Sequence, residues 1–364
     1  MIPLLFAAAA LAAPTRGLEP VQPTTTPSGE MYRRQVALVI GIDDYPDDSM
    51  DLSYAVADAK AVASRLRERF GYDDVIELYN EDATRAAVLT RLTELASLHP
   101  DDALFVFWAG HGIHTETASG ETIGYLVPRD GTIDPTTAAV SNISMDDIRT
   151  LVGRSVPARH RFLVADTCYS GMLATRSVTT VPDADAAWLA RNRNRDTFQV
   201  LTAGQDDETV LDTGPGGHSV FTARLLEALD EADDYTTASE LAVHVQRTVR
   251  ADAWMRGGHA QNPAFGRVAG TADFVLAPIT APPLPPPGPR RSRHLAGVAA
   301  GSFIIGAAGI TTASLTRQSY VSSDLSAGPQ PDIVRLNRTA GITGYTALGA
   351  TGILLGTAVV VREW

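Results

Sequence analysis

Short apolar runs alternate with amphipathic segments between residues 34 and 278 of this chain, and this alternation constrains the fold more than any other feature. Uninterrupted apolar runs of this length are typical of strands that are buried on both faces of a parallel sheet. Strands are predicted at 35–42, 74–79, 103–109, 161–165 and 198–203. Apolar residues at helical spacing predict helices near 52–70, 84–99, 144–152, 219–232 and 237–253. The sequence therefore predicts an α/β domain whose mostly parallel sheet is covered by helices on both faces.

The segments that flank this domain, which is predicted at 34–278, differ from it in composition. Residues 1–13 are almost wholly apolar and predict a signal peptide, with an N-terminal membrane anchor as the alternative. Residues 14–33 are rich in Pro, Thr and Gly, which predicts a flexible leader. A Pro-rich run within 279–294 favours a stiff, extended linker.

Two uncharged apolar stretches follow the linker, at 295–316 and 340–361, with a loop at 317–339 between them. Each is about 22 residues long, which is enough to span a bilayer. Each also contains glycines four residues apart, which would let two helices approach closely. These features predict a C-terminal transmembrane hairpin. A pair of buried soluble helices is the alternative.

Net charge and cysteine content exclude several classes of site. Asp and Glu total 42 against 30 for Lys and Arg, so the formal net charge is -12. An acidic chain is a poor match to nucleic acid, because binding to nucleic acid depends on neutralising phosphates. Cys168 is the only cysteine, which excludes an intrachain disulfide and a zinc site built from cysteines.

Reactive residue types follow two of the predicted strands. The strand at 103–109 runs into Gly110-His111-Gly112, and the strand at 161–165 ends near Cys168. Neighbouring parallel strands would bring these ends together at the carboxyl edge of the sheet, where ligands bind in such folds. A nearby imidazole can take the proton of a thiol, and flanking glycines leave peptide N–H groups free to hold an oxyanion. Taken singly, the cysteine could instead be a small buried apolar residue, and the histidine a satisfied polar one.

Three segments together resemble the caspase-like cysteine peptidases, and most of all their metacaspase and bacterial orthocaspase branch. They are Val-Ala-Leu-Val-Ile-Gly-Ile-Asp-Asp-Tyr at 36–45, Phe-Trp-Ala-Gly-His-Gly at 107–112 and Asp-Thr-Cys-Tyr-Ser-Gly at 166–171. The separation of His111 from Cys168 is compatible with the roughly 50 residues expected in caspases. The resemblance implies a three-layer α/β/α sandwich and cysteine-type endopeptidase activity.

The resemblance also implies a role for individual residues. Cys168 is matched to the nucleophile and His111 to the general acid and base. The backbone N–H groups of Gly112 and Cys168 are matched to the oxyanion hole. The sequence around Cys168 departs from the Gln-Ala-Cys-x-Gly signature of caspases, so cleavage after aspartate is not expected.

A preference for basic residues is implied instead. In metacaspases the Asp two residues before the nucleophile, matched by Asp166, lines an acidic pocket that accepts Arg or Lys. A second pocket Asp lies at a position that resembles Asp58, for which the alternative is a solvated helix residue. A guanidinium in a desolvated pocket needs carboxylate partners, which fits both assignments. Ala109 departs from the pattern, because several metacaspases have a polar residue there.

Two further properties of related enzymes bear on this chain. A polar stretch between residues 171 and 198 contains four arginines, and related enzymes often cut a linker there. Self-processing is therefore a hypothesis, and a basic surface loop is its alternative. No metal site is predicted and no cofactor is required. Some metacaspases need calcium, but the acids here form no recognisable calcium loop, so calcium activation stays open.

The sequence as a whole predicts a membrane-anchored endopeptidase that acts on peptide or protein substrates. It would form an acyl-enzyme on Cys168 and cleave after Arg or Lys. Arginines on the two sides of the predicted hairpin nearly balance, so the N-terminal signal is the argument that puts the catalytic domain outside the cytoplasm, in the periplasm if the source is bacterial. The alternatives are a catalytically idle module that binds partners at the membrane, and a hydrolase that uses the same dyad on a non-peptide acyl substrate.

Overall fold

The structure is a computed structural model, and it describes residues 31–283 apart from 168–175, 178–180, 183, 206, 207, 209 and 259. All of these residues belong to the first of two structural units, Met1–Pro285. The predicted signal peptide and both predicted transmembrane helices lie outside the described residues. Within the described part of the chain, no helix is both long and apolar enough to cross a membrane.

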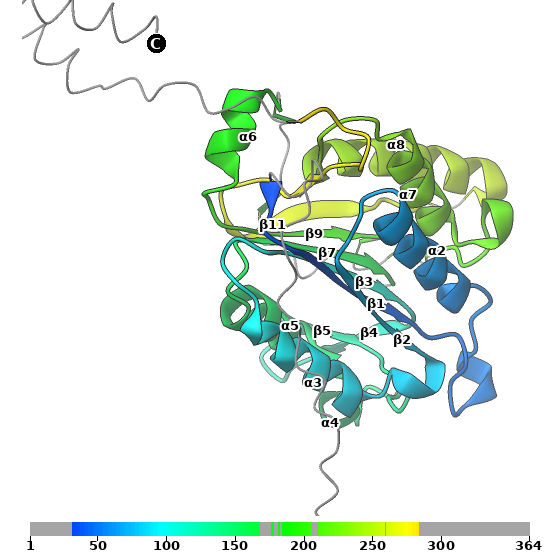
Figure 1. The fold of residues 1–364 in the computed structure, drawn as a ribbon. Coiled ribbons are helices and arrows are strands. Elements are labelled where there is room, and N and C mark those ends of the chain that lie inside the picture. Colours follow the sequence, from blue (N-terminus) through cyan, green and yellow to red (C-terminus); the bar gives the residue numbers. More distant parts are fainter. Residues whose placement is uncertain are drawn as a thin grey trace, which may run out of the picture. The chain divides into compact units, whose positions relative to one another are not determined.

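A seven-stranded sheet in the order β2-β1-β3-β7-β9-β11-β8 forms the centre of the fold (Figure 1). The five strands from β2 to β9 run parallel, and β11 pairs antiparallel with both β9 and β8. Their bounds are β1 (Gln35–Gly41), β2 (Asp74–Tyr79), β3 (Ala103–Ala109), β7 (His160–Asp166), β8 (Arg176–Ser177), β9 (Thr197–Thr202) and β11 (Ala264–Gly270). The predicted parallel sheet is confirmed, and the antiparallel edge is an addition to it.

The central strands are apolar throughout because both of their faces are covered. Every residue of β1, β3 and β7 is buried. In β1, Ala37 and Val39 enter one hydrophobic core, whereas Val36, Leu38 and Ile40 enter the core on the opposite face. Successive side chains of a strand point to opposite faces, so an uninterrupted apolar run supplies both cores at once.

Three helices cover one face of the sheet (Figure 1). They are α2 (Ala55–Glu68), α7 (Val220–Glu231) and α8 (Ala238–Gly257). The buried stripe of α2 includes Val62 and Leu66, spaced four residues apart as a single helix face requires. A capping box formed by Thr237 and Glu240 begins α8, and Gly258 ends it in the left-handed region at φ 64°.

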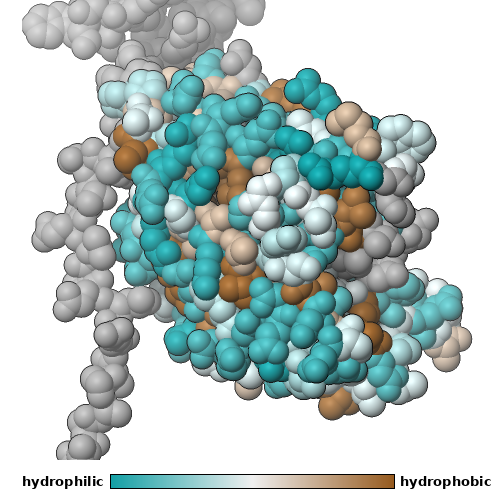
Figure 2. Space-filling view, turned by 90° about the vertical axis from the view of Figure 1, so that its right-hand side faces the viewer, coloured by the Kyte–Doolittle hydropathy of each residue, from teal (hydrophilic) through white to brown (hydrophobic). Residues whose placement is uncertain are grey.

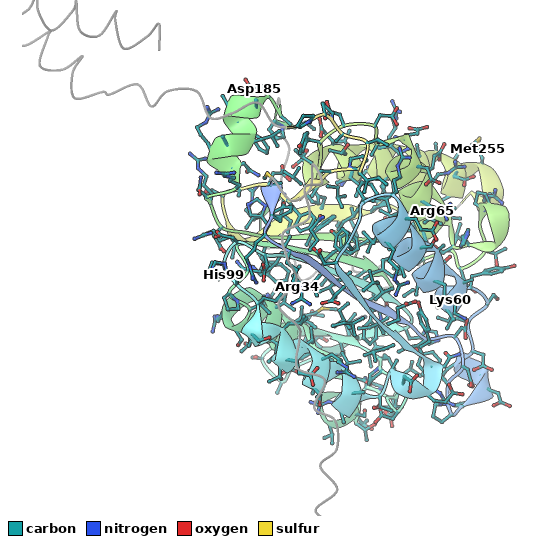
Figure 3. All side chains as sticks on the ribbon, in the orientation of Figure 1. Arg34, Lys60, Arg65, His99, Asp185 and Met255 are labelled. Atoms are coloured by element: carbon teal, nitrogen blue, oxygen red, sulfur yellow. The ribbon has the colours of Figure 1, made fainter. Side chains whose placement is uncertain are left out.

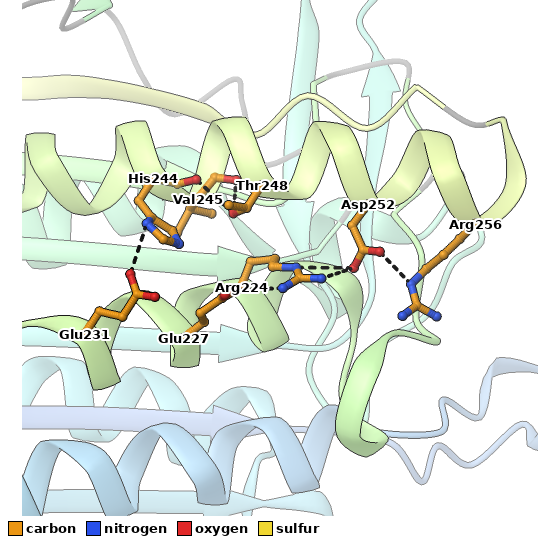
Figure 4. A network of polar contacts seen from close by, with 8 residues as sticks. All are labelled: Arg224, Glu227, Glu231, His244, Val245, Thr248, Asp252 and Arg256. Carbon is orange, nitrogen blue, oxygen red and sulfur yellow. Dashed lines mark hydrogen bonds and ion pairs between the residues drawn. The ribbon is translucent and has the colours of Figure 1, made fainter.

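Charged side chains join α7 to α8 above this core (Figure 4). Asp252 of α8 accepts a hydrogen bond from Nη2 of Arg224 at 3.0 Å and one from Nε of Arg256 at 2.9 Å. Arg224 also pairs with Glu227 within α7 at 2.6 Å. The side chain of Asp252 is only 7% exposed, so this carboxylate depends on its two arginine partners for compensation.

The opposite face carries short helices and a small antiparallel sheet. These elements are α3 (Arg85–Glu94), α4 (Ala138–Ser141), α5 (Met145–Thr150), β4 (Gly112–Glu116), β5 (Thr122–Leu126) and β6 (Ile143–Ser144). The remaining helix and strands are α6 (Ala186–Asn192), β10 (Thr236–Thr237) and β12 (Val275–Leu276). The small sheet matters for the site because β4 begins directly after Gly110 and His111, and so it fixes where the chain goes after β3.

Candidate active site

The carboxyl ends of β3 and β7 lie side by side in the sheet. Ala109, the last residue of β3, pairs with Asp166, the last residue of β7, and the Gly110 N–H donates to the Asp166 carbonyl at 3.3 Å. His111 follows β3 by two residues, as Cys168 follows β7. Cys168 lies outside the described residues, so its roles as nucleophile and as part of the oxyanion hole stay predictions.

His111 is held by a tyrosine and by a carbonyl group. Its backbone N–H donates to the Tyr45 hydroxyl at 3.0 Å, and that hydroxyl donates to the Val127 carbonyl at 3.3 Å. The two rings lie 5.1 Å apart between centroids. Burial raises the pKa of Tyr45 well above its usual value, so the hydroxyl stays protonated and can make both bonds.

The ring of His111 has a defined tautomer when it is neutral. Its Nε2 atom lies 2.6 Å from the carbonyl oxygen of Met50, at the end of the 3-10 helix η1 (Asp48–Met50). A carbonyl oxygen can only accept a hydrogen bond, so Nε2 must carry the proton. The Nδ1 lone pair of neutral His111 is therefore left to act as a base.

Gly110 keeps this arrangement possible, because a Cβ atom at this position would lie 3.0 Å from the Tyr45 hydroxyl oxygen. Contacts that close are tighter than most, so a side chain here would push Tyr45 away from His111. Gly112, the other predicted oxyanion residue, is buried as the first residue of β4 and pairs with Leu126 of β5. Its predicted part in the oxyanion hole is untested, because the hole also needs Cys168.

A cavity of about 220 Å³ opens beside His111 and contains both predicted pocket carboxylates. Its lining consists of Leu52, Ala55, Asp58, Ala109, Gly110, His111, Asp166, Thr167, Val210, Asp212 and Ser219. Asp58 is 1% exposed, which rules out the alternative of a solvated helix residue. The five parallel strands point their carboxyl ends to the right in Figure 1. Figure 2 views the molecule from that side, where apolar patches interrupt a mostly hydrophilic face.

A third carboxylate, Asp212, also lines the cavity and was not predicted. Its Oδ2 accepts the Ser53 N–H at 2.9 Å, which ties the loop after β9 to the start of α2. Asp58, Asp166 and Asp212 thus come from a helix, a strand end and a loop that are far apart in the sequence. No periodicity or motif around Asp212 could have indicated its position.

The hydroxyl groups at the start of α7 hold Asp166. Ser219 precedes α7 as its N-cap and accepts the Thr222 N–H at 2.8 Å. The same Ser219 hydroxyl donates to Asp166, and the Thr222 hydroxyl donates to Asp166 at 2.6 Å. The sequence signal for Ser219 was that of a helix cap, and its additional bond to the pocket could not be inferred from it.

Burial and mutual repulsion raise the pKa values of the two predicted pocket acids. Burial and then the charges of Asp166 and Asp212 raise the pKa of Asp58 to about 9, against a donated N–H from Ser219 that lowers it. Burial raises the pKa of Asp166 to about 6, although the Ser219 and Thr222 hydroxyls oppose this. Like charges in a desolvated site disfavour ionisation, and the described residues of the lining include no Lys or Arg to offset them.

A histidine that the motifs did not indicate completes the acidic cluster. Nδ1 of His218 lies 2.6 Å from Oδ1 of Asp58, and the Ser219 N–H donates to the other oxygen of Asp58 at 3.2 Å. Desolvation, with a smaller effect of the Arg65 charge, lowers the pKa of His218. Its only sequence signal was its place just before a helix cap.

A second cavity, of about 250 Å³, lies at the amino ends of the strands, away from these residues. The charged and polar groups of its lining already pair with one another, Arg33 with Asp102, Arg159 with Asp101 and Tyr32 with His160. In the described ranges, no cluster of three or more His, Cys, Asp or Glu could hold a metal ion. Calcium activation, which the sequence leaves open, is not tested by this geometry.

Comparisons with known proteins agree with the motifs. The family model described as the caspase domain matches residues 34–275, more than half of the chain. The chain is 33% identical over 150 residues to Metacaspase-1 of Cryptococcus neoformans, which covers 38% of this chain and 32% of that protein. It is 27% identical over 193 residues to Metacaspase-1B of Aspergillus clavatus, which covers 48% and 45%.

A plant relative matches at a similar level. Metacaspase-7 of Arabidopsis thaliana is 29% identical over 170 residues, which cover 41% of this chain and 40% of that protein. The chain therefore spans less than half the length of these curated relatives. The match to the family model over most of the folded domain confirms the resemblance carried by the three motifs. The chain therefore belongs to the caspase-domain family.

Proposed function

We propose that this chain hydrolyses peptide bonds on the carboxyl side of arginine or lysine, with Cys168 as nucleophile and His111 as general base and acid. The observation that carries the proposal is the cavity beside His111, in which three carboxylates converge and whose lining includes no Lys or Arg among the described residues. A guanidinium or ammonium group in that cavity would balance the charges of Asp58, Asp166 and Asp212. An acidic side chain would be repelled by them.

In the proposed reaction, the lone pair on Nδ1 of His111 acts as the base. Nδ1 takes the proton of the Cys168 thiol, and the thiolate attacks the carbonyl carbon of the scissile bond. The oxyanion that forms accepts hydrogen bonds from backbone N–H groups, and Gly112 and Cys168 are the proposed donors. Nδ1 returns its proton to the leaving amine, then takes one from water, whose oxygen displaces the sulfur and releases the acid. The Met50 carbonyl keeps the proton on Nε2 throughout.

The experiment compares fluorogenic peptides that differ only at the residue before the cleaved bond, with Arg, Lys, citrulline, Asp or Leu there. Citrulline matches arginine in shape but lacks its charge. We expect turnover with Arg and Lys only, abolished by Cys168→Ala. We expect Asp58→Asn, Asp166→Asn and Asp212→Asn each to lower kcat/KM for the Arg peptide by about tenfold or more.

Asp134→Asn is the matched control, because Asp134 is an exposed carboxylate outside the cavity. It should leave kcat/KM unchanged. Turnover with the Asp peptide would refute the basic pocket, and equal turnover with Arg and citrulline would refute the role of charge. Runs with and without calcium, and gels that compare the active chain with Cys168→Ala, test calcium activation and self-processing in the same samples.

We extend the proposal to location: the chain is anchored in a membrane with its peptidase domain outside the cytoplasm. This rests on the sequences of 1–13, 295–316 and 340–361 alone. Alkaline phosphatase fused after Ala277 should be active in cells. An inactive fusion there, together with an active one in the 317–339 loop, would reverse the proposed topology.

A further inference from the structure

The buried carboxyl group of Asp58 contacts a partly exposed histidine. Its own side chain is 2% exposed, whereas that of His218, which lies 2.6 Å away, is 23% exposed. The remaining Asp58 oxygen accepts the buried Ser219 N–H. His218 thus lies between a carboxyl group inside the cavity wall and the water outside it.

The loop that presents His218 is held by the backbone. It includes the 3-10 helix η6 (Pro215–Gly217), where Gly216 and Gly217 have φ values of 70° and 78° that favour glycine. The Gly214 N–H donates to the His218 carbonyl at 2.6 Å and closes the loop. Ser219 follows directly as the N-cap of α7, so the position of His218 is set by a helix start and a closed turn.

The charged groups that face this pair come from four elements. Asp58 and Arg65 lie on α2, with Arg65 paired to Asp230 of α7 at 3.1 Å. Asp166 ends β7, and Asp212 lies in the loop before η6. The described lining of the cavity contains three carboxylates and no arginine, and Arg65, whose charge acts on His218, already has Asp230 as its partner.

We propose that His218 is a positioning residue of the specificity pocket, which accepts the proton of Asp58 when a basic side chain enters and holds it while that side chain is bound. The proposal rests on the proposed function and names a further residue of the same pocket. Before binding, the Asp58 O–H donates to Nδ1 of neutral His218. On binding, the O–H bond breaks, an N–H bond forms on Nδ1, and the imidazolium N–H donates to the new carboxylate.

The electrostatics of the empty pocket support this starting state. Burial and the neighbouring acids raise the pKa of Asp58 to about 9, while desolvation lowers the pKa of His218, so near pH 7 the proton belongs to Asp58. A guanidinium that enters the pocket is stabilised by an ionised carboxylate, so Asp58 must give up its proton to another group. Transfer of this proton over the 2.6 Å from Asp58 to Nδ1 of His218 keeps it within the protein. The affinity for the guanidinium then does not depend on releasing a proton into solution.

The test separates binding from cleavage. The full chain with Cys168→Ala is titrated with benzamidine by calorimetry, at several pH values and in buffers of different ionisation enthalpy, which gives the number of protons exchanged. We expect close to no net proton release between pH 7 and 8 and an affinity that varies little with pH. Adding His218→Asn, which cannot hold a proton, should make binding release about one proton.

The affinity of the His218→Asn chain should then fall roughly tenfold for each unit of pH below 9, and by about a hundredfold at pH 7. At pH 9 it should approach that of the parent chain. In the active chain, the same substitution should raise KM for an Arg peptide in this pH-dependent way and leave kcat unchanged. His218→Gln, whose side chain likewise cannot hold a proton, should give the same results.

His99→Asn is the matched control, because His99 lies at the amino ends of the strands, far from Arg65 of α2 in Figure 3. A loss of affinity for His218→Asn that is equal at all pH values would mean a structural role only and would overturn the proposal. Full proton release by the parent chain, or no benzamidine binding, would also overturn it. If benzamidine binds as expected but no peptide is cut, the proposed function fails while the role of His218 stands.

Discussion

The hydroxyl of Tyr45 is the residue-scale feature on which the position of His111 depends. It accepts the His111 N–H and donates to the Val127 carbonyl while it is itself buried. Tyr45→Phe would leave that N–H without a partner, which costs about 1–3 kcal/mol of unfolding free energy. The ring would still fill its space, so we expect kcat to fall roughly tenfold or more through misplacement of His111, with KM unchanged. Urea unfolding and peptide kinetics measure the two effects.

Tyr72→Phe is the matched control for this change. The Tyr72 ring is also buried, but its hydroxyl has no hydrogen-bond partner among the described residues. Removing an unsatisfied buried hydroxyl should leave stability unchanged or raise it, and should not alter kcat. Equal behaviour of the two variants would show that the hydroxyl bonds of Tyr45 contribute nothing to the site.

Among the secondary-structure elements, α7 and α8 are linked by the carboxylate of Asp252 (Figure 4). Asp252→Asn would leave Arg224 and Arg256 without their shared anion in a partly buried place. We expect a loss of about 1–3 kcal/mol of unfolding free energy, with activity retained. Glu231→Gln is the control, because Glu231 is 63% exposed and its contact with His244 is 3.7 Å long. A loss for Glu231→Gln as large as that for Asp252→Asn would contradict this account.

Elements with a strong local pattern were predictable from the sequence. The strand predicted at 103–109 matches β3, because an uninterrupted apolar run marks a buried parallel strand. The strand predicted at 74–79 matches β2, a partly buried strand at the edge of the sheet. The antiparallel strand β11 was missed. Its sequence, Ala-Phe-Gly-Arg-Val-Ala-Gly, mixes small, charged and apolar residues, and its pairing with β9 is decided by tertiary contacts.

The same limit explains which pocket residues were predictable. Asp166 was found because it lies within the motif around Cys168, and Asp58 because its segment resembles the family. Asp212 and His218 lie in the irregular chain between β9 and α7, where no period or motif applies. Their place in the pocket depends on bonds to Ser53 and Asp58, more than 150 residues away along the chain. Only the folded chain brings these groups together.

For the molecule as a whole, the clustered carboxylates of the pocket lower the free energy of unfolding when no cation is bound to them. The pKa values of Asp58 and Asp166 are raised in the folded chain, to about 9 and about 6. The folded state then binds more protons than the unfolded state between pH 4 and 9. Stability from these groups is fully present below their unfolded pKa values and is lost as the pH rises through the folded ones.

Thermal unfolding as a function of pH tests this balance. We expect the Tm to fall between pH 5 and 9, and Asp58→Asn to remove part of that fall, so that the variant has a Tm roughly 3 °C or more above the parent at pH 9. Benzamidine should raise the Tm of the parent more than that of the variant. In Asp134 the Thr136 N–H lowers the pKa, so any contribution of this carboxylate to stability is constant above its unfolded pKa, and Asp134→Asn should leave the fall in Tm between pH 5 and 9 unchanged. A Tm for Asp58→Asn at or below that of the parent at pH 9 would mean that the clustered carboxylates carry no electrostatic penalty, and it would contradict the preference of the pocket for a basic side chain.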